Sequence, residues 1–328
     1  MNPIIPKSQP DKPAESVLEW LLDSDPSIRW QVMRDLTNEP AEAVAAMRSR
    51  VATEGWGAEL LKRQNTDGSW GDGASTPVWS STLHTLQLLW NMGLDPLSEP
   101  ARRAVDLVRA KVTWGPGFGD ASFFEGETEP CINGRVIGLA GYFGEASDRL
   151  LERLLREQLK DGGWNCEAEN GSVRSSFHTT ICVLEGLLEY EKSRSATEEV
   201  TAARLQAQEY LLERRLFRSL SNGEVVALDK KTGQPTAWMS FSFPTTWHYD
   251  VLRGLDTLRN AGVRPDERVA EAVELVTKKR DADGRWPREN IHADPVGLAM
   301  EGAAGTPSRW NTLRAQRVLD WYSSGSQH

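Results

Sequence analysis

The sequence lacks the features that mark membrane and secreted proteins. Among its 328 residues, no apolar run approaches the roughly 18–20 residues that a membrane-spanning helix requires. The segment from Met1 to Lys7 has no apolar core of the kind found in signal peptides. We therefore expect a cytoplasmic protein with no integral membrane span.

Cysteines are few, and basic residues do not cluster. The net charge is −9, and the lysines and arginines are scattered along the chain, so a nucleic-acid partner is not expected. The three cysteines do not make a disulfide framework, and each is predicted to bind a metal ion or to be a buried thiol. The oligomeric state is left open.

Long linkers rich in serine or glycine, and sustained period-two alternation, are absent as well. Helical spacing of apolar residues recurs instead between residues 17 and 323. Residues 1–14 are rich in proline and charge and are predicted to be a flexible tail. Residues 15–328 are predicted to form a single all-α domain.

Three short segments of the chain are near copies of one another. In each copy the glycine suits a positive φ, the aspartate can cap nearby backbone, and the tryptophan offers an apolar face and one N–H donor. Each copy lies between helix-like stretches, which indicates stacked helical hairpins, and degenerate copies are predicted at 114–119 and near Phe217. The copies are Gln64-Asn-Thr-Asp-Gly-Ser-Trp70, Gln158-Leu-Lys-Asp-Gly-Gly-Trp164 and Arg280-Asp-Ala-Asp-Gly-Arg-Trp286.

Two kinds of helix alternate in these hairpins. One kind carries dense charge, as in 98–112, 196–214 and 266–279, and suits an outer ring. The other kind is apolar with small residues at matching places, which suits a closely packed inner ring. We therefore predict an α/α toroid of about five to six hairpins around a central cavity, with the inner helices all beginning at one end. The apolar helices include 82–89, 136–142, 181–187, 251–255 and 312–319.

The repeated Q-x-x-x-G-x-W turn (QW motif) resembles the repeat of squalene-hopene cyclases and related terpenoid cyclases. The toroid is similar to that of protein prenyltransferase β subunits, and the resemblance covers roughly residues 55–323. It implies an isoprenoid or similarly elongated apolar substrate. The Asp-x-Asp-Asp motif of class II cyclases is absent, since Asp281-Ala-Asp-Gly284 lacks the final aspartate, and the chain is about half as long as a two-domain cyclase. Ordinary squalene-type cyclisation is therefore not expected.

A second similarity concerns metal binding. The segment from Arg174 to Leu187 resembles R-x-x-Y-H-T-x-x-C-x-L-x-G-L, which carries the zinc-binding histidine of prenyltransferase β subunits. Glu129-Pro-Cys131 stands where those proteins have Asp-x-Cys, with glutamate in place of aspartate. The resemblance thus implies metal positions at Glu129, Cys131 and His178.

The residues at the starts of the inner helices point to the same region. Cys131, His178 and His248 open three successive inner helices, and Cys166 lies in the loop before the His178 helix. Together they offer two thiolates and two imidazoles, which zinc prefers. The alternative is that these are buried thiols and capping histidines. Cys182 is predicted to be a core residue, and we expect His84 and His292 to be ordinary polar residues.

Acidic and aromatic residues gather at the same helix starts. Glu129 and Asp250 are candidate catalytic acids, and Asp250 is equally well placed to orient His248 or to act as a helix cap. The aromatic residues are candidates to line the cavity and bind an apolar polyene, or they only wedge the toroid together. They are Trp79, Phe177, Trp247, Tyr249 and Trp310.

Three functional hypotheses follow. The leading one is a terpenoid cyclase- or prenyltransferase-like enzyme that binds an isoprenoid-like substrate in an aromatic-lined cavity with a zinc site at its mouth. The zinc would act as a Lewis acid or hold a thiolate or water nucleophile, whereas a saturated Cys2His2 set would be structural. The second is a metal-free, cation-initiated cyclase that uses Glu129 or Asp250 as the acid. The third is a non-catalytic toroid that binds a lipid or a protein partner.

Overall fold

The computed structural model describes residues 16–72, 77–145, 147–194, 197–226, 237–292 and 297–325, so the predicted tail at residues 1–14 lies outside the described residues. The only strands within these ranges are β1 (Trp286–Pro287) and β2 (Pro307–Ser308), which pair in antiparallel fashion. This confirms the all-α class. The helices are α1 (Val17–Leu22), α2 (Pro26–Asp35), α3 (Ala41–Ser49), α4 (Gly55–Lys62), α5 (Val78–Met92), α6 (Glu99–Lys111), α7 (Pro130–Phe143), α8 (Asp148–Arg156), α9 (Phe177–Ser193), α10 (Glu198–Glu213), α11 (Val251–Asn260), α12 (Ala270–Lys278) and α13 (Arg309–Gly325).

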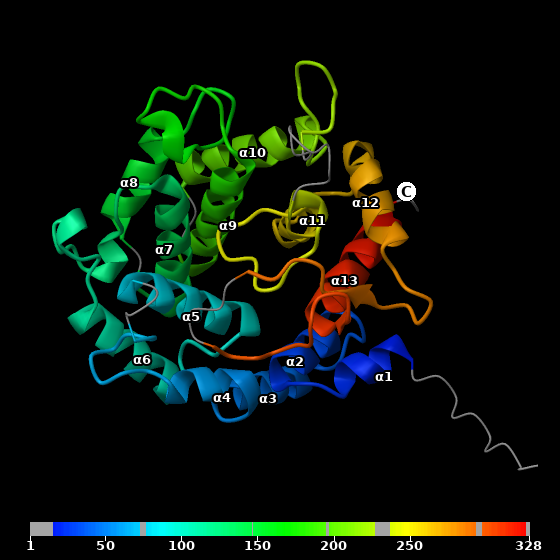
Figure 1. Ribbon diagram of the computed structural model, residues 1–328, viewed down its shortest axis with the longest axis horizontal. Helices are drawn as coiled ribbons and strands as arrows, with labels where there is room; N and C mark the ends of the chain where they lie inside the picture. The colour runs from blue at the N-terminus through cyan, green and yellow to red at the C-terminus, as the bar shows by residue number, and fades with distance from the viewer. Residues whose placement is uncertain are drawn as a thin grey trace, which may run out of the picture.

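The helices form two concentric rings (Figure 1). Helices α2, α5, α7, α9, α11 and α13 surround the centre, and α4, α6, α8, α10 and α12 lie outside them. The last helix closes the ring against the first ones, because Arg317 of α13 donates hydrogen bonds to Gln31 and Asp35 of α2. The predicted α/α toroid of five to six helical hairpins is confirmed.

Short polar residues begin most of these helices by accepting hydrogen bonds from backbone N–H groups of the first turn. Ser16 and Glu19 form a reciprocal capping box at α1. Glycine in the left-handed conformation ends two inner helices, at Gly93 after α5 and at Gly144 after α7. The capping residues of the other helices include Asp25, Ser98, Ser147, Ser176, Thr197 and Asp250.

The inner helices α7 and α9 approach each other through glycines. A Cβ atom at Gly134 would lie 2.6 Å from the backbone nitrogen of Val183, and one at Gly186 would overlap the carbonyl oxygen of Gly134. Only glycine permits this separation. The small residues that the sequence placed on the inner helices therefore set how closely α7 and α9 pack.

The three Asp-Gly-x-Trp turns have the same construction. Each tryptophan is fully buried and donates its indole N–H to a carbonyl ten residues earlier: Trp70 to Leu60, Trp164 to Leu154 and Trp286 to Val276. The glycines of the three turns have φ between 80° and 92°. Each turn therefore ties its inner helix to the end of the preceding outer helix.

The glutamines of two turns extend the contact to the next hairpin, since Gln64 donates to the carbonyl of Ala104 and Gln158 to that of Ala203. The degenerate turn at Trp114 differs, because its indole N–H donates forward along the chain to Phe123. No helix in the described part of the chain is long and apolar enough to cross a lipid bilayer.

Candidate functional site

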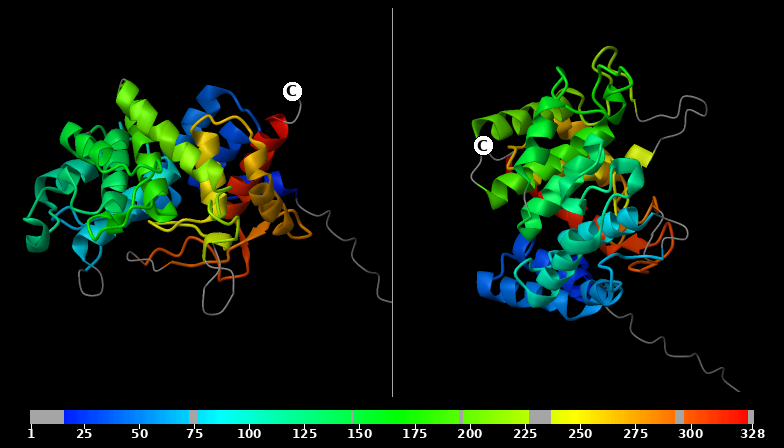
Figure 2. Two further views of the ribbon diagram at one scale, coloured as in Figure 1. Left: turned by 90° about the horizontal axis from the view of Figure 1, so that it is seen from above. Right: turned by 90° about the vertical axis from the view of Figure 1, so that its left-hand side faces the viewer.

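The inner helices α5, α7, α9 and α11 all begin at one face of the ring, which we call the N-terminal rim. Trp79, Cys131 and His178 lie in the first turns of α5, α7 and α9, and His248 and Asp250 directly precede α11. The yellow and orange connecting segments before α11 and α13 gather at this face (Figure 2). The predicted common direction of the inner helices therefore brings these residues to one side of the molecule.

Three residues at the N-terminal rim form a group that suits a metal ion. The ligand atoms of Glu129, Cys131 and Cys166 all lie within 4.8 Å of one another, and the Cys131 Sγ is 3.5 Å from a carboxylate oxygen of Glu129. Two thiolates and a carboxylate are zinc ligands, and three protein ligands leave one coordination position open. We call these three residues the rim group.

The two thiols of the rim group differ in acidity. The hydrogen bond with Cys166, followed by burial, raises the pKa of the Cys131 thiol. The same hydrogen bond lowers the pKa of the Cys166 thiol, and the Thr179 hydroxyl, 3.5 Å away, contributes to the shift. Cys166 is therefore the more acidic thiol of the pair.

His178 and His248, the other two predicted ligands, lie outside the rim group. The Nδ1 atom of His178 is 2.7 Å from the backbone nitrogen of Tyr249, and its Nε2 atom is 2.8 Å from Nε1 of Trp238. Both imidazole nitrogens of His178 are thus already in contact with N–H donors, which leaves neither nitrogen of this residue free for a metal. The described residues assemble a Glu-Cys-Cys group in place of the predicted Cys2His2 set.

The histidines instead form a cluster of their own at the rim. The rings of His178 and His248 lie 6.0 Å apart, and the ring of His292 stacks on His248 at 3.9 Å. Burial lowers the pKa of all three imidazoles to about 4, and the neighbouring charges add to the effect. His292, expected to be an ordinary polar residue, joins this cluster from a distant loop with no sequence motif around it.

The two candidate acids have different surroundings. Asp250 is buried at the start of α11, where its carboxylate accepts hydrogen bonds from the backbone of Arg253 at 2.7 Å and from the hydroxyl of Ser242 at 3.1 Å. These contacts match the capping alternative. Glu129 is exposed and belongs to the rim group.

The five predicted aromatic residues do not share one cavity. Phe177 and Tyr249 pack against each other with ring centroids 5.2 Å apart, and Trp79 packs against Trp114 at 5.1 Å. Trp247 is 43% exposed. Only Trp310, which stacks on Phe243 at 4.0 Å, lines the central cavity described next. The other contacts agree with the alternative in which aromatic residues wedge the toroid together.

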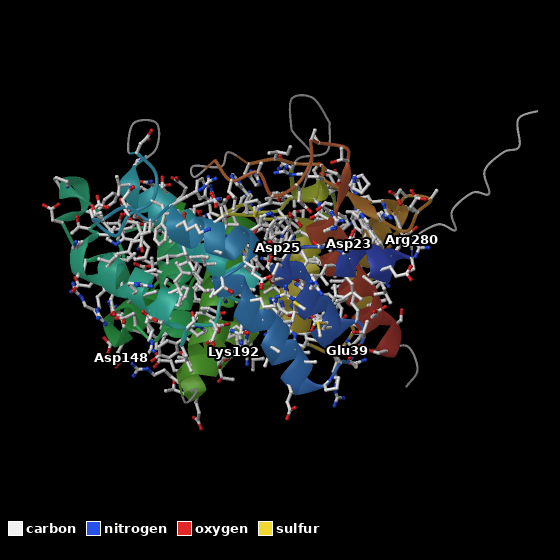
Figure 3. The ribbon with its side chains drawn as sticks, turned by 90° about the horizontal axis from the view of Figure 1, so that it is seen from below. Asp23, Asp25, Glu39, Asp148, Lys192 and Arg280 are labelled. Atoms are coloured by element: carbon white, nitrogen blue, oxygen red, sulfur yellow. The ribbon has the colours of Figure 1, made fainter. Side chains whose placement is uncertain are left out.

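The central cavity has a volume of about 470 Å³. Its wall comes largely from the C-terminal halves of the inner helices, and Lys192, near the end of α9, lies at the edge of the molecule away from the loops in Figure 3. Aromatic and charged side chains share this wall, and no residue of the rim group lines it. The cavity is therefore more polar than predicted, and the described residues do not place the rim group at its mouth. The aromatic lining residues are Trp30, Trp90, Tyr142, Phe243 and Trp310, and the charged ones include Arg48, Glu185, Arg253, Asp256, Arg314 and Arg317.

Comparisons with known proteins do not assign the chain to a family. No family model matches the chain, and no curated protein matches it. Among solved structures, the type II terpene cyclase MstE from Scytonema is 16% identical with a TM-score of 0.43, and the match covers 93% of this chain and 88% of that one. A protein from Actinoplanes is 18% identical with a TM-score of 0.41, covering 92% and 90% of the two chains. Likeness at this level supports no argument about activity, so the fold class rests on the two rings and the three turns.

Proposed function

We propose that the protein is a zinc-dependent, terpenoid cyclase- or prenyltransferase-like enzyme that acts on an isoprenoid or similarly elongated substrate. The observation that carries the proposal is the rim group, in which Glu129, Cys131 and Cys166 converge at the N-terminal rim of the toroid. Zinc bound there would supply a Lewis acid at the end of the ring where the inner helices begin. Because three protein ligands leave a position open, this group favours a catalytic over a structural site.

The chain holds the rim group in place through the loop before α7. The carboxylate of Glu127 accepts a hydrogen bond from the backbone of Glu129, and the Asn133 side chain both donates to and accepts from the backbone of Glu127. Arg153 donates to the carbonyl of Thr128. These contacts orient Glu129 and Cys131 before any ligand binds, which is what a preorganised site requires.

The central cavity, whose wall contains no residue of the rim group, is the candidate site for the body of a substrate that is apolar in part. Trp310 and its stacking partner Phe243 offer apolar surface, and Trp30 and Trp90 lie elsewhere on the same wall. The charged side chains beside them suit a substrate that also carries polar groups. A 470 Å³ space is within the usual range for a small-molecule site.

Metal analysis of the purified protein tests the proposal. We expect about one zinc per chain in wild type, and loss of zinc in Cys131→Ser, Cys166→Ser and Glu129→Gln. The matched control is Cys182→Ala, which removes the remaining cysteine, a buried thiol on α9, and should leave zinc bound. Substitution with cobalt should give thiolate charge-transfer absorption that falls stepwise in the single and double cysteine variants.

Several outcomes would contradict the proposal. A protein prepared under reducing conditions that neither contains nor takes up zinc would rule out the metal site. Turnover of a polyprenyl substrate by metal-free protein, abolished by Asp250→Asn, would indicate a cation-initiated cyclase instead. Zinc binding without turnover of any polyprenyl substrate would favour a non-catalytic toroid that binds a lipid or a protein.

A further inference from the structure

Arg135 is a buried arginine whose side chain has no hydrogen-bond partner among the described residues. It lies on α7, one helical turn after Cys131, and only 2% of its surface is exposed. Its Nε, Nη1 and Nη2 atoms contact no acceptor among the described residues. A guanidinium group remains charged in proteins, and all of its N–H donors seek acceptors. Arg135 therefore presents an unsatisfied cation to the inside of the ring.

The other interior arginines show that this fold can pair a buried guanidinium. Arg253 binds both oxygens of Glu185 and donates to the carbonyl of His248. Arg317 binds both oxygens of Asp256. Arg135 differs from these residues because none of its side-chain nitrogens has an acceptor among the described residues.

The carboxylate of Glu185 does not accept a hydrogen bond from Arg135. Glu185 interacts electrostatically with the guanidinium group of Arg135. Its carboxylate oxygens, however, already accept hydrogen bonds from Arg253 and from the hydroxyl of Thr257. Two buried guanidinium groups thus share one carboxylate. The region between α7, α9 and α11 carries a surplus positive charge that an incoming anion would neutralise.

We propose that Arg135 binds an oxyanion, a carboxylate or phosphate group of a small molecule, between α7, α9 and α11 on the inner side of the N-terminal rim. The planar guanidinium fork suits two oxygens of such a group. The close glycine contact between Gly134 and Gly186 fixes the backbone of Arg135 against α9, so the donor is preorganised. His248, which is half-buried, is near enough for the charge of Arg135 to lower its pKa, although burial and His292 contribute more.

This proposal is independent of zinc, because it depends on the unpaired donors of Arg135. A competing explanation is that Arg135 balances the negative charge of the rim group, since Cys131 lies one turn away on the same helix. The two explanations predict different responses to added anions and to removal of zinc.

The test measures thermal unfolding of wild type, Arg135→Met and Arg135→Lys, each with zinc and after chelation. Sodium phosphate and sodium acetate are titrated separately at constant ionic strength. The control is Arg102→Met, which removes an exposed arginine from α6. We expect a saturable rise of the wild-type and control Tm with at least one anion, and the preferred anion distinguishes phosphate from carboxylate ligands. In Arg135→Met the apparent affinity should fall about tenfold or more, while the Tm without anion should equal or exceed that of wild type.

Three results would overturn the proposal. One is an equal anion effect in wild type and Arg135→Met. Another is the absence of any anion effect combined with loss of zinc in Arg135→Met, which would assign Arg135 to the rim group. The third is a lower Tm of Arg135→Met in the absence of anions, together with no anion effect in wild type, which would make the residue structural. If Arg135→Met does not fold, Arg135→Lys decides, because a lysine keeps the charge but should lose the bidentate contact and weaken the anion effect.

Discussion

Replacing Gly186 with alanine should separate α7 from α9. The added Cβ would overlap the carbonyl oxygen of Gly134 and would lie 2.7 Å from the Cγ2 atom of Ile137. The obstructing oxygen belongs to helix backbone, so it cannot move without the helix. Overpacking of this kind costs about 1–3 kcal/mol, and the better helix propensity of alanine returns up to about 1 kcal/mol. Because the strain falls at the upper end of that range, we expect a net loss of about 2 kcal/mol.

Urea unfolding followed by circular dichroism measures this loss. The matched control is Gly141→Ala on α7, the inner helix that faces α9, where a Cβ would meet its nearest atoms at 3.2 Å, a distance that small movements can relieve. We expect the control to lie within about 0.5 kcal/mol of wild type. Gly186→Ala should also bind zinc more weakly, since a shift of α7 displaces Cys131 from Cys166. Equal stability of the two variants would refute the conclusion that Gly186 sets the helix separation.

Two further predictions concern the turns and the histidine cluster. Trp164→Phe removes the donor to the carbonyl of Leu154 and leaves a void, so chemical denaturation should show that the free energy of unfolding falls by about 2–4 kcal/mol. The control is Trp247→Phe, at a 43% exposed site, which should change the free energy of unfolding little. His178, His248 and His292 have pKa values lowered to about 4, so the unfolded chain takes up protons first as the pH falls. Stability should be greatest above about pH 6.5 and decline toward pH 4, and a urea midpoint unchanged between pH 7 and pH 5 would contradict this.

The features that could be predicted from the sequence depend on local chemistry. Trp70, Trp164 and Trp286 lie in turns whose geometry is set by a few neighbouring residues, so the repeat identified both the turns and the rings that they connect. The meeting of Cys131 and Cys166 followed from the common direction of the inner helices.

The features that the sequence did not reveal depend on how separate segments are oriented. His178 begins the predicted helix, but its imidazole contacts Tyr249 and Trp238 and lies outside the rim group. Glu129, which the resemblance to prenyltransferase β subunits indicated as a metal position, is part of that group. The side-chain directions that decide between these arrangements are set by tertiary packing. One signal was present in the sequence: Arg135 interrupts an otherwise nearly uncharged inner helix. A charge in that position indicates either a buried partner or a ligand.

The polar character of the central cavity was also not predicted, because it too depends on how separate helices are oriented. The inner helix 312–319 reads as apolar, yet Arg314 and Arg317 are three residues apart and therefore share one face. That face points inward, where both guanidinium groups approach Asp256 of α11. The last helix thus closes the ring through charged side chains, in contrast to the glycine contact between α7 and α9. A buried network of this kind contributes little net stability but penalises any other register of the closing helix, because a shift would leave charges unpaired.

Arg253 connects this polar interior to the N-terminal rim. Its guanidinium binds Glu185, which lines the central cavity, and also donates to the carbonyls of Thr246 and His248. The same carboxylate also interacts electrostatically with Arg135. A cation that entered the cavity and drew Glu185 away would break the ion pair of Arg253 and remove negative charge from the surroundings of Arg135, whereas an anion at Arg135 would relieve the shortage of negative charge. The two ends of the ring therefore share one carboxylate, and occupation of either end must alter the electrostatic free energy of the other.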